Sequence, residues 1–256
     1  MIHGVCCGAA GIKAAADAGL AYIEPALNQM RSLDDEKLDA IRREAEAAGV
    51  PAAGFNCFFG GVIMLYKTDR DEILGYAEHN FKVAQRLGGS YCVIGSGRSR
   101  AVPDDMDRAA AEDAFCSIVS AMGKSAAKYG LELVIEPLQT AETNFINTLS
   151  DGLRISRRIG AENVGCLVDF YHFYQNGEDL SEFDSLEPGE LRHVHIARPN
   201  ADRGYMRESD RETLSAWAEK LKNMGYNGRI SLECTWGGDF AAEVKTAARM
   251  LELFER

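Results

Sequence analysis

Eight short apolar runs alternate with longer segments whose apolar residues recur at helical spacing, and this alternation limits the fold more than any other feature. Short apolar runs bounded by turn residues are typical of buried strands, and strands that alternate with helices are typical of a parallel sheet. The predicted strands lie near residues 4–7, 22–25, 52–57, 90–94, 131–137, 164–169, 191–197 and 229–234. Each unit then has about 32 residues, enough for a strand, a crossover helix and two loops.

Between the strands, stripes of apolar residues predict amphipathic helices. The stripes are Leu38, Ile41, Ala45 and Ala48; Ile73, Ala77, Phe81 and Ala84; Phe115, Ile118, Met122 and Ala126; Leu214, Trp217, Leu221 and Met224; and Phe240, Val244, Ala247 and Leu251. Helices often end in a left-handed glycine, and the candidates are Gly49, Gly88, Gly130, Gly160 and Gly225. We therefore predict an α/β fold, a single eight-stranded parallel (β/α)8 TIM barrel forming one domain over residues 1–256. A doubly wound open sheet is the alternative.

Composition and charge exclude several classes of protein. With 46% hydrophobic and 26% charged residues the chain resembles an ordinary globular protein, and no run approaches the roughly 20 apolar residues that cross a bilayer. The 39 acidic residues outnumber the 28 basic ones and give a formal charge of -11, so we expect neither nucleic acid nor a membrane as a partner. Seven cysteines without a C-x-x-C pair, and an N-terminus without a secretory signal, predict a cytoplasmic protein.

The last four predicted strands each end on a residue that can bind a metal ion. These residues are Glu136, Asp169, His195 and Glu233, and active sites of such barrels lie at the carboxyl ends of the strands. Three buried carboxylates and a histidine at one barrel mouth need a counter-charge. We therefore predict one divalent ion. Oxygen-rich ligation with a single imidazole favours Mn²⁺ or Mg²⁺, with Co²⁺ or Zn²⁺ as alternatives.

Each of these residues also has a purely structural interpretation. One acidic strand end can cap a helix or face solvent, but four on consecutive strands favour a site. His193 points to the same face as His195, and we expect it to be packed or to support the site. Cys234 is expected in the core. Trp236, together with Phe58 and Phe59, either lines the pocket against the carbon face of a sugar or packs beneath the loops.

Several short motifs then resemble a known superfamily. They are Ile135-Glu136-Pro137-Leu138, the segment 142–148, Val168-Asp169-Phe170-Tyr171-His172, His193-Val194-His195 and Leu232-Glu233. In order and spacing they are similar to the xylose-isomerase-like sugar isomerase/epimerase superfamily, in its branch of ketose 3-epimerases, hydroxypyruvate isomerases and inosose dehydratases. The segments 56–59 and 95–98 agree with this resemblance.

The resemblance implies roles for individual residues. It assigns the metal to Glu136, Asp169, His195 and Glu233, and the proton transfers to Glu136 and Glu233. Glu142, six residues after Glu136, matches a position that contacts substrate hydroxyl and carbonyl oxygens.

His172, three residues after Asp169, matches a second position of this kind. Relatives also carry an arginine after the metal histidine, and this chain has two, Arg198 and Arg203. We favour Arg203 as the substrate contact because Gly204 beside it allows the loop to fold over the mouth.

The residue types suit chemistry on a carbon beside a carbonyl. A metal stabilises the enediolate, one glutamate removes the proton and the other returns it. We predict a metal-dependent isomerase or epimerase of a small polyhydroxy ketone or aldehyde. A lyase like inosose dehydratase is the nearest alternative. An abasic-site endonuclease is disfavoured by the few histidines and the acidic charge, and a non-catalytic sugar-binding barrel remains the last alternative. Mouth loops are short, so a homo-oligomer could complete the pocket, although the sequence shows no dimerisation signal.

Overall fold

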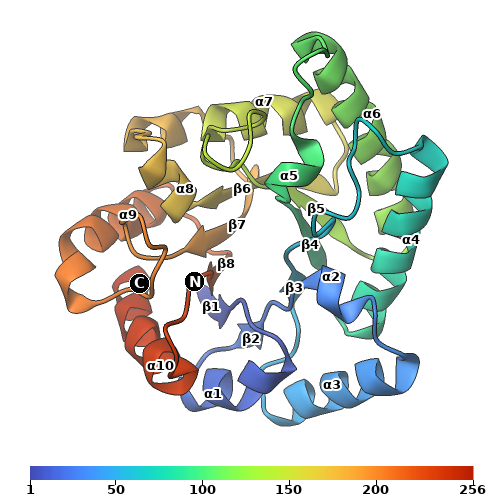
Figure 1. Ribbon diagram of the computed structural model, residues 1–256. Coiled ribbons are helices and arrows are strands. Elements are labelled where there is room, and N and C mark those ends of the chain that lie inside the picture. Colours follow the sequence, from blue (N-terminus) through green and yellow to red (C-terminus); the bar gives the residue numbers. More distant parts are fainter. Residues whose placement is uncertain (256) are drawn as a thin grey trace.

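The computed structural model describes residues 1–255, in which eight parallel strands form a barrel surrounded by helices (Figure 1). The strands are β1 (Ile2–Val5), β2 (Tyr22–Ile23), β3 (Gly54–Phe55), β4 (Tyr91–Ile94), β5 (Glu132–Ile135), β6 (Val164–Asp169), β7 (Leu191–Ile196) and β8 (Arg229–Leu232). Their order is β2-β1-β8-β7-β6-β5-β4-β3. Parallel bridges from Ile23 to Ala52 and from Ala26 to Asn56 join the two ends of this order. The predicted barrel is confirmed, and the open-sheet alternative is wrong.

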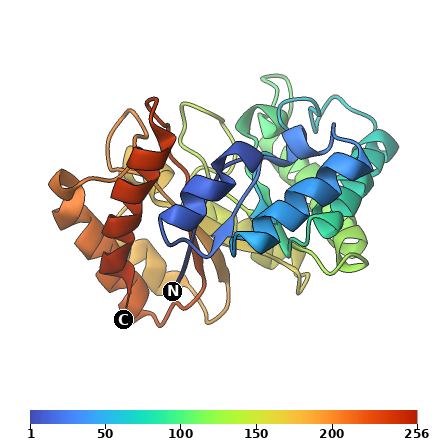
Figure 2. The ribbon, with the colours of Figure 1, turned by 90° about the horizontal axis from the view of Figure 1, so that it is seen from below.

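Helices surround the strands (Figure 2). They are α1 (Ile12–Asp17), α2 (Leu27–Met30), α3 (Asp35–Ala47), α4 (Arg70–Arg86), α5 (Gly97–Arg100), α6 (Arg108–Ala127), α7 (Leu149–Ile159), α8 (Phe170–Gln175), α9 (Arg211–Asn223) and α10 (Phe240–Leu251). The five predicted stripes fall on α3, α4, α6, α9 and α10, except that Ala48 and Met224 are the C-cap residues after α3 and α9. All five predicted glycines have positive φ, and Gly160 caps α7 with a φ of 64°. Within residues 1–255, no helix is both long and apolar enough to cross a membrane.

The hydrophobic core has two parts because the strands have two faces. One face packs against the helices, and the other faces the interior of the barrel. The larger part lies between strands and helices and contains Phe170 and Trp217, whose rings stack 4.5 Å apart. A smaller cluster contains Tyr91, Val93, Val134 and Leu167. Strands buried on both faces are apolar along most of their length, so polar residues among them stand out.

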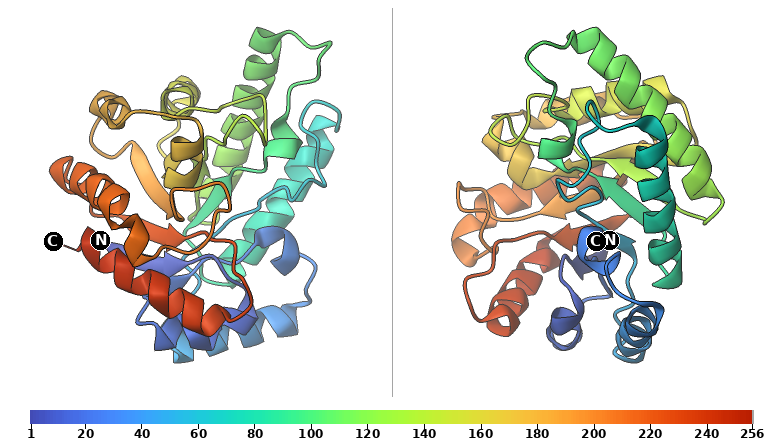
Figure 3. Two further views of the ribbon diagram at one scale, coloured as in Figure 1. Left: turned by 60° about the vertical axis from the view of Figure 1, so that its left-hand side comes forward. Right: turned by 45° about the vertical axis from the view of Figure 1, so that its right-hand side comes forward.

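Both ends of the described chain lie at the amino-terminal end of the barrel (Figure 3). His3 in β1 and Glu255 line the same surface pocket there. The opposite end of the barrel, at the carboxyl ends of the strands, is therefore formed by the loops that follow each strand.

Arg100 ties together two of these loops from inside the protein. Its side chain is 1% exposed, and it donates hydrogen bonds to the carbonyl oxygens of Ile94 (3.0 Å), Glu136 (2.7 Å) and Ile146 (3.2 Å). The guanidinium thus holds the main chain at the end of β5, where Glu136 begins the next loop.

We expect Arg100→Met to lower the free energy of unfolding by about 3 kcal/mol, because three carbonyl oxygens would lose a charged donor. Urea denaturation measures this change. Arg98→Met is the matched control, since Arg98 lies two residues away and is exposed, and it should change stability by less than about 0.5 kcal/mol. Equal effects of the two substitutions would contradict the role given to Arg100.

Candidate metal centre and active site

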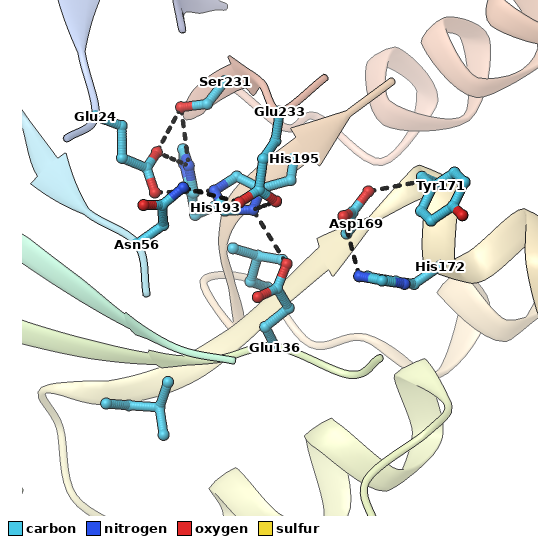
Figure 4. A network of polar contacts seen from close by, with 12 residues as sticks. Glu24, Asn56, Glu136, Asp169, Tyr171, His172, His193, His195, Ser231 and Glu233 are labelled. Atoms are coloured by element: carbon cyan, nitrogen blue, oxygen red, sulfur yellow. Dashed lines mark hydrogen bonds and ion pairs between the residues drawn. The ribbon is translucent and has the colours of Figure 1, made fainter. Parts of the chain in front are cut away.

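The four residues predicted to bind a metal come together at the barrel mouth (Figure 4). Glu136 follows β5, Asp169 ends β6, His195 lies in β7 and Glu233 follows β8. One ligand atom from each lies within 4.8 Å of those of the other three. Four consecutive strands therefore contribute to one cluster.

The register of the strands, and the close contact of Glu136 with Gly95, explain why these four side chains meet. Asp169 pairs with His195 across β6 and β7, and His195 pairs with Ser231 across β7 and β8. The side chain of Glu136, which follows β5, occupies space left by Gly95, which follows β4. A Cβ atom on residue 95 would lie 2.1 Å from Glu136 Oε2. A larger residue at position 95 would displace the Glu136 carboxylate from this position.

His195 lies at the centre of the cluster and is fully buried. Its Nδ1 is 3.1 Å from Glu136 Oε1 and 2.8 Å from Glu233 Oε2. Burial alone would lower the pKa of His195, but the charges of Glu233 and Glu24 raise it well above its ordinary value. The surrounding carboxylates thus favour the charged form of the ring.

The two glutamates of the cluster have pKa values shifted in opposite directions. Burial, followed by the charge of Glu233, raises the pKa of Glu136. Burial acts in the same direction on Glu233, but His195 and Arg203 outweigh it and lower the pKa of Glu233. The surroundings of Glu136 thus favour its protonated form, and those of Glu233 favour its ionised form.

Arg203 faces the cluster from the loop after β7. Its Nη2 donates to Glu233 Oε2 at 2.5 Å and also to a carboxylate oxygen of Asp169. Its Nη1 lies 3.4 Å from His172 Nε2. The guanidinium supplies one positive charge to a group of three carboxylates.

The structure separates the two candidate arginines. Arg198 points elsewhere, with its Nη2 3.3 Å from Asp210 Oδ1 and its Nη1 3.7 Å from Asp202 Oδ2. The left-handed residue of this loop is Arg203 itself, with a φ of 51°, whereas Gly204 is not among the residues with positive φ. A non-glycine residue in this region is strained, and such strain concentrates at functional sites.

A pocket of about 430 Å³ opens above the cluster. Its lining residues are Asn28, Cys57, Gly60, Gly61, Ser96, Gly97, Arg98, Glu136, Leu138, Glu142, His172, Arg203 and Glu233. Three of the four predicted substrate contacts, Glu142, His172 and Arg203, are therefore at the pocket. His172 is 1% exposed, and its Nδ1 has no hydrogen-bond partner among the described residues.

The aromatic residues near the mouth lie outside this lining. Trp236 stacks on Tyr205 at 6.4 Å and packs edge-on against Phe240 at 5.0 Å. Phe58 and Phe59 are buried against each other and against α4. Packing beneath the loops therefore describes all three. Cys234, expected in the core, is only partly buried.

The donor set fits a divalent cation. An ion with bonds of about 2.1 Å keeps its ligand atoms at most about 4.2 Å apart, close to the spacing of this cluster. Three carboxylates with one imidazole are ligands typical of Mg²⁺ and Mn²⁺. Glu136, Asp169, His195 and Glu233 would hold the ion.

Two further polar residues of the site were missed by the sequence analysis. Glu24 directly follows β2, is fully buried, and accepts a hydrogen bond from His195 Nε2 at 2.9 Å. Asn56 directly follows β3 and donates through Nδ2 to Glu233 Oε1 at 2.8 Å. Both occupy the strand-end position that identified the other four residues, so the same rule applied to strands two and three would have found them.

Comparisons with known proteins agree with this geometry. A provisionally named hydroxypyruvate isomerase of Streptomyces coelicolor is 25% identical over 225 residues, which cover 82% of this chain and 78% of the relative. The 2-oxo-tetronate isomerase of Cupriavidus necator is 27% identical over 138 residues, 52% of this chain and 51% of the relative. The D-allulose 3-epimerase of Methylomonas sp. has the same fold, with a TM-score of 0.82 at 19% identity over 100% of this chain and 98% of that structure.

The family model described as "Xylose isomerase-like TIM barrel" matches residues 12–254. This match spans every strand but β1 and includes all four residues of the cluster. The chain therefore belongs to the xylose isomerase-like TIM barrel family.

Proposed function

We propose that this protein is a divalent-metal-dependent sugar isomerase or epimerase that moves a proton at a carbon beside a carbonyl. The observation that carries the proposal is the cluster of Glu136, Asp169, His195 and Glu233 at the base of a small polar pocket. The relatives support the same class, since their names describe isomerases and epimerases of small hydroxylated carbonyl compounds.

Glu136 and Glu233 are the proposed proton-transfer pair. One carboxylate removes the proton from the carbon, the electron pair of the broken C–H bond forms a C=C bond, and the carbonyl oxygen becomes an oxyanion. The other glutamate then returns a proton to carbon. In an epimerase the proton reaches the opposite face of the same carbon, the C=C bond breaks and the oxyanion becomes the carbonyl again. In an isomerase the proton reaches the former carbonyl carbon, the neighbouring hydroxyl becomes the new carbonyl, and its proton passes to the oxyanion. A bound divalent ion supplies Lewis-acid stabilisation of the enediolate.

The remaining pocket residues suit a small polyhydroxy substrate. His172, Glu142 and Arg203 present hydrogen-bonding groups to the pocket, and Arg203 can donate charge-assisted bonds to a carbonyl or hydroxyl oxygen. A volume of about 430 Å³ suits a small molecule. The seven cysteines are all free thiols, which supports our placement of the activity in the reducing cytoplasm.

Metal binding can be tested by thermal unfolding. We expect Mn²⁺ or Mg²⁺ to raise the midpoint, with a stabilisation of about 2.7 kcal/mol at one hundred times the dissociation constant. Asp169→Asn should abolish most of the shift, because it removes a ligand charge while asparagine can still cap α8. Glu142→Gln, in the same pocket but outside the cluster, should keep it. An unchanged midpoint in the wild type would refute the metal site.

Proton transfer can be tested in deuterated buffer with Mn²⁺ and a panel of ketoses, aldoses, hydroxypyruvate and inososes. We expect one substrate class to take up deuterium at carbon with no other change in mass, whereas a lyase would lose water. Glu136→Gln and Glu233→Gln should each slow uptake by about 100-fold or more.

The matched control for this experiment is Glu132→Gln. Glu132 begins β5, the strand that Glu136 follows, but lines a different pocket at the other end of the barrel. It should exchange deuterium at the wild-type rate. Full exchange by Glu136→Gln and Glu233→Gln proteins that are shown to be folded and metal-loaded would overturn the assignment of the pair.

A further inference from the structure

Glu24 is a buried carboxylate on the far side of His195 from Glu136 and Glu233 (Figure 4). It follows β2, and its exposed fraction is 0%. An isolated carboxylate in such a place would be costly, so its surroundings must compensate for lost hydration.

Both oxygens of Glu24 are fully engaged. Oε1 lies 2.9 Å from His195 Nε2. Oε2 accepts hydrogen bonds from Ser231 Oγ at 2.6 Å and from Tyr91 Oη at 2.8 Å, and it lies 3.0 Å from His193 Nε2. Donors from β4, β7 and β8 thus converge on one acid.

An ionised carboxylate can only accept a hydrogen bond, so the nitrogen that faces it must carry the proton. In a neutral His195 that proton is on Nε2, which leaves the lone pair on Nδ1. Nδ1 is the nitrogen that points toward Glu136 and Glu233. The Glu24 contact therefore selects the tautomer that can bind a cation in the cluster.

We propose that Glu24 is a positioning residue that fixes the tautomer and orientation of His195 for metal binding. The proposal rests on the metal site of the proposed function. Residues that hydrogen-bond a metal-binding histidine from behind typically change metal affinity 10–100-fold when they are mutated.

Close backbone contacts show that the barrel is built around this polar group. Tyr91 reaches Glu24 only because residue 54 is glycine, where a Cβ atom would lie 2.2 Å from the Tyr91 ring. Tyr22, whose hydroxyl lies 2.9 Å from Ser231 Oγ, likewise passes over Gly4, where a Cβ atom would lie 2.3 Å from its ring. Larger residues at either glycine would displace the tyrosines.

Cys6, Glu24 and His195 form a second close group, but it does not make a separate metal site. It shares His195 with the first cluster, and a neutral imidazole has only one lone pair for a metal. With Nδ1 assigned to the cluster, Nε2 remains a donor to Glu24.

Glu24→Gln tests the proposal because it preserves shape while removing the charge that holds the Nε2 proton. Isothermal titration of the metal-free protein with Mn²⁺ should give a dissociation constant 10–100-fold above that of the wild type. Circular dichroism of the variant should match the wild type. An unchanged dissociation constant would overturn the proposal.

Tyr91→Phe and Ser231→Ala are matched controls, since each removes one donor to Glu24 but leaves the His195 contact in place. Both should change the Mn²⁺ dissociation constant less than about 3-fold, well below the 10–100-fold expected for Glu24. If either weakened binding as strongly as Glu24→Gln, the effect would be one of general packing and the proposal would fail.

A measurement on the wild type covers the case in which Glu24→Gln does not fold. Nitrogen-15 NMR of the histidines in the Mg²⁺-loaded protein should show His195 protonated at Nε2 and not at Nδ1, and the reverse tautomer would overturn the proposal. These readouts do not depend on turnover. A wild type that binds Mn²⁺ with the expected tautomer but exchanges no substrate proton would refute the proposed function and leave the role of Glu24 intact.

Discussion

Repulsion among buried carboxylates is the constraint around which this site is organised. Glu136 and Asp169 are buried and Glu233 is partly buried, so their mutual repulsion is stronger than it would be in solution. Arg203 and His195 supply the positive charge that the structure itself contains. A divalent ion would meet the same need at a site where its charge can also act on a substrate.

The barrel tolerates this concentration of charge because its geometry holds each group separately. Every acidic side chain of the cluster comes from its own strand, and the strands are fixed by main-chain hydrogen bonds that do not depend on the site. Gly95 leaves the space that Glu136 occupies, and Arg100 holds the main chain at Glu136 from behind. Side chains attached to such fixed positions meet the requirement for a preorganised site.

Much of the fold was predictable because it depends on periodicity. The eight apolar runs and five stripes are local patterns, and each fell on the element expected for it. For helix α7 the sequence analysis used only Gly160 at its end, although Leu149, Leu153 and Ile155 form a buried face and Thr148 and Asp151 form a capping box at its start. Glu24 was overlooked for a different reason: it lies in the second predicted strand, near residues 22–25, and only the last four strands were considered as a source of metal-binding residues.

The sequence by itself determined the barrel and the four strand-end residues, because strand ends in a closed parallel sheet must meet at one rim. It did not determine the contacts among them. Arg203 and not Arg198 reaches the cluster, and the backbone at Arg203 is left-handed, a conformation that the sequence analysis did not predict. Whether Trp236 faces the pocket depends on packing against Tyr205 and Phe240. The contacts of Arg203 with Asp169 and Glu233, and of Trp236 with Tyr205, join residues about 30 positions apart in the sequence, and only the folded chain brings them together.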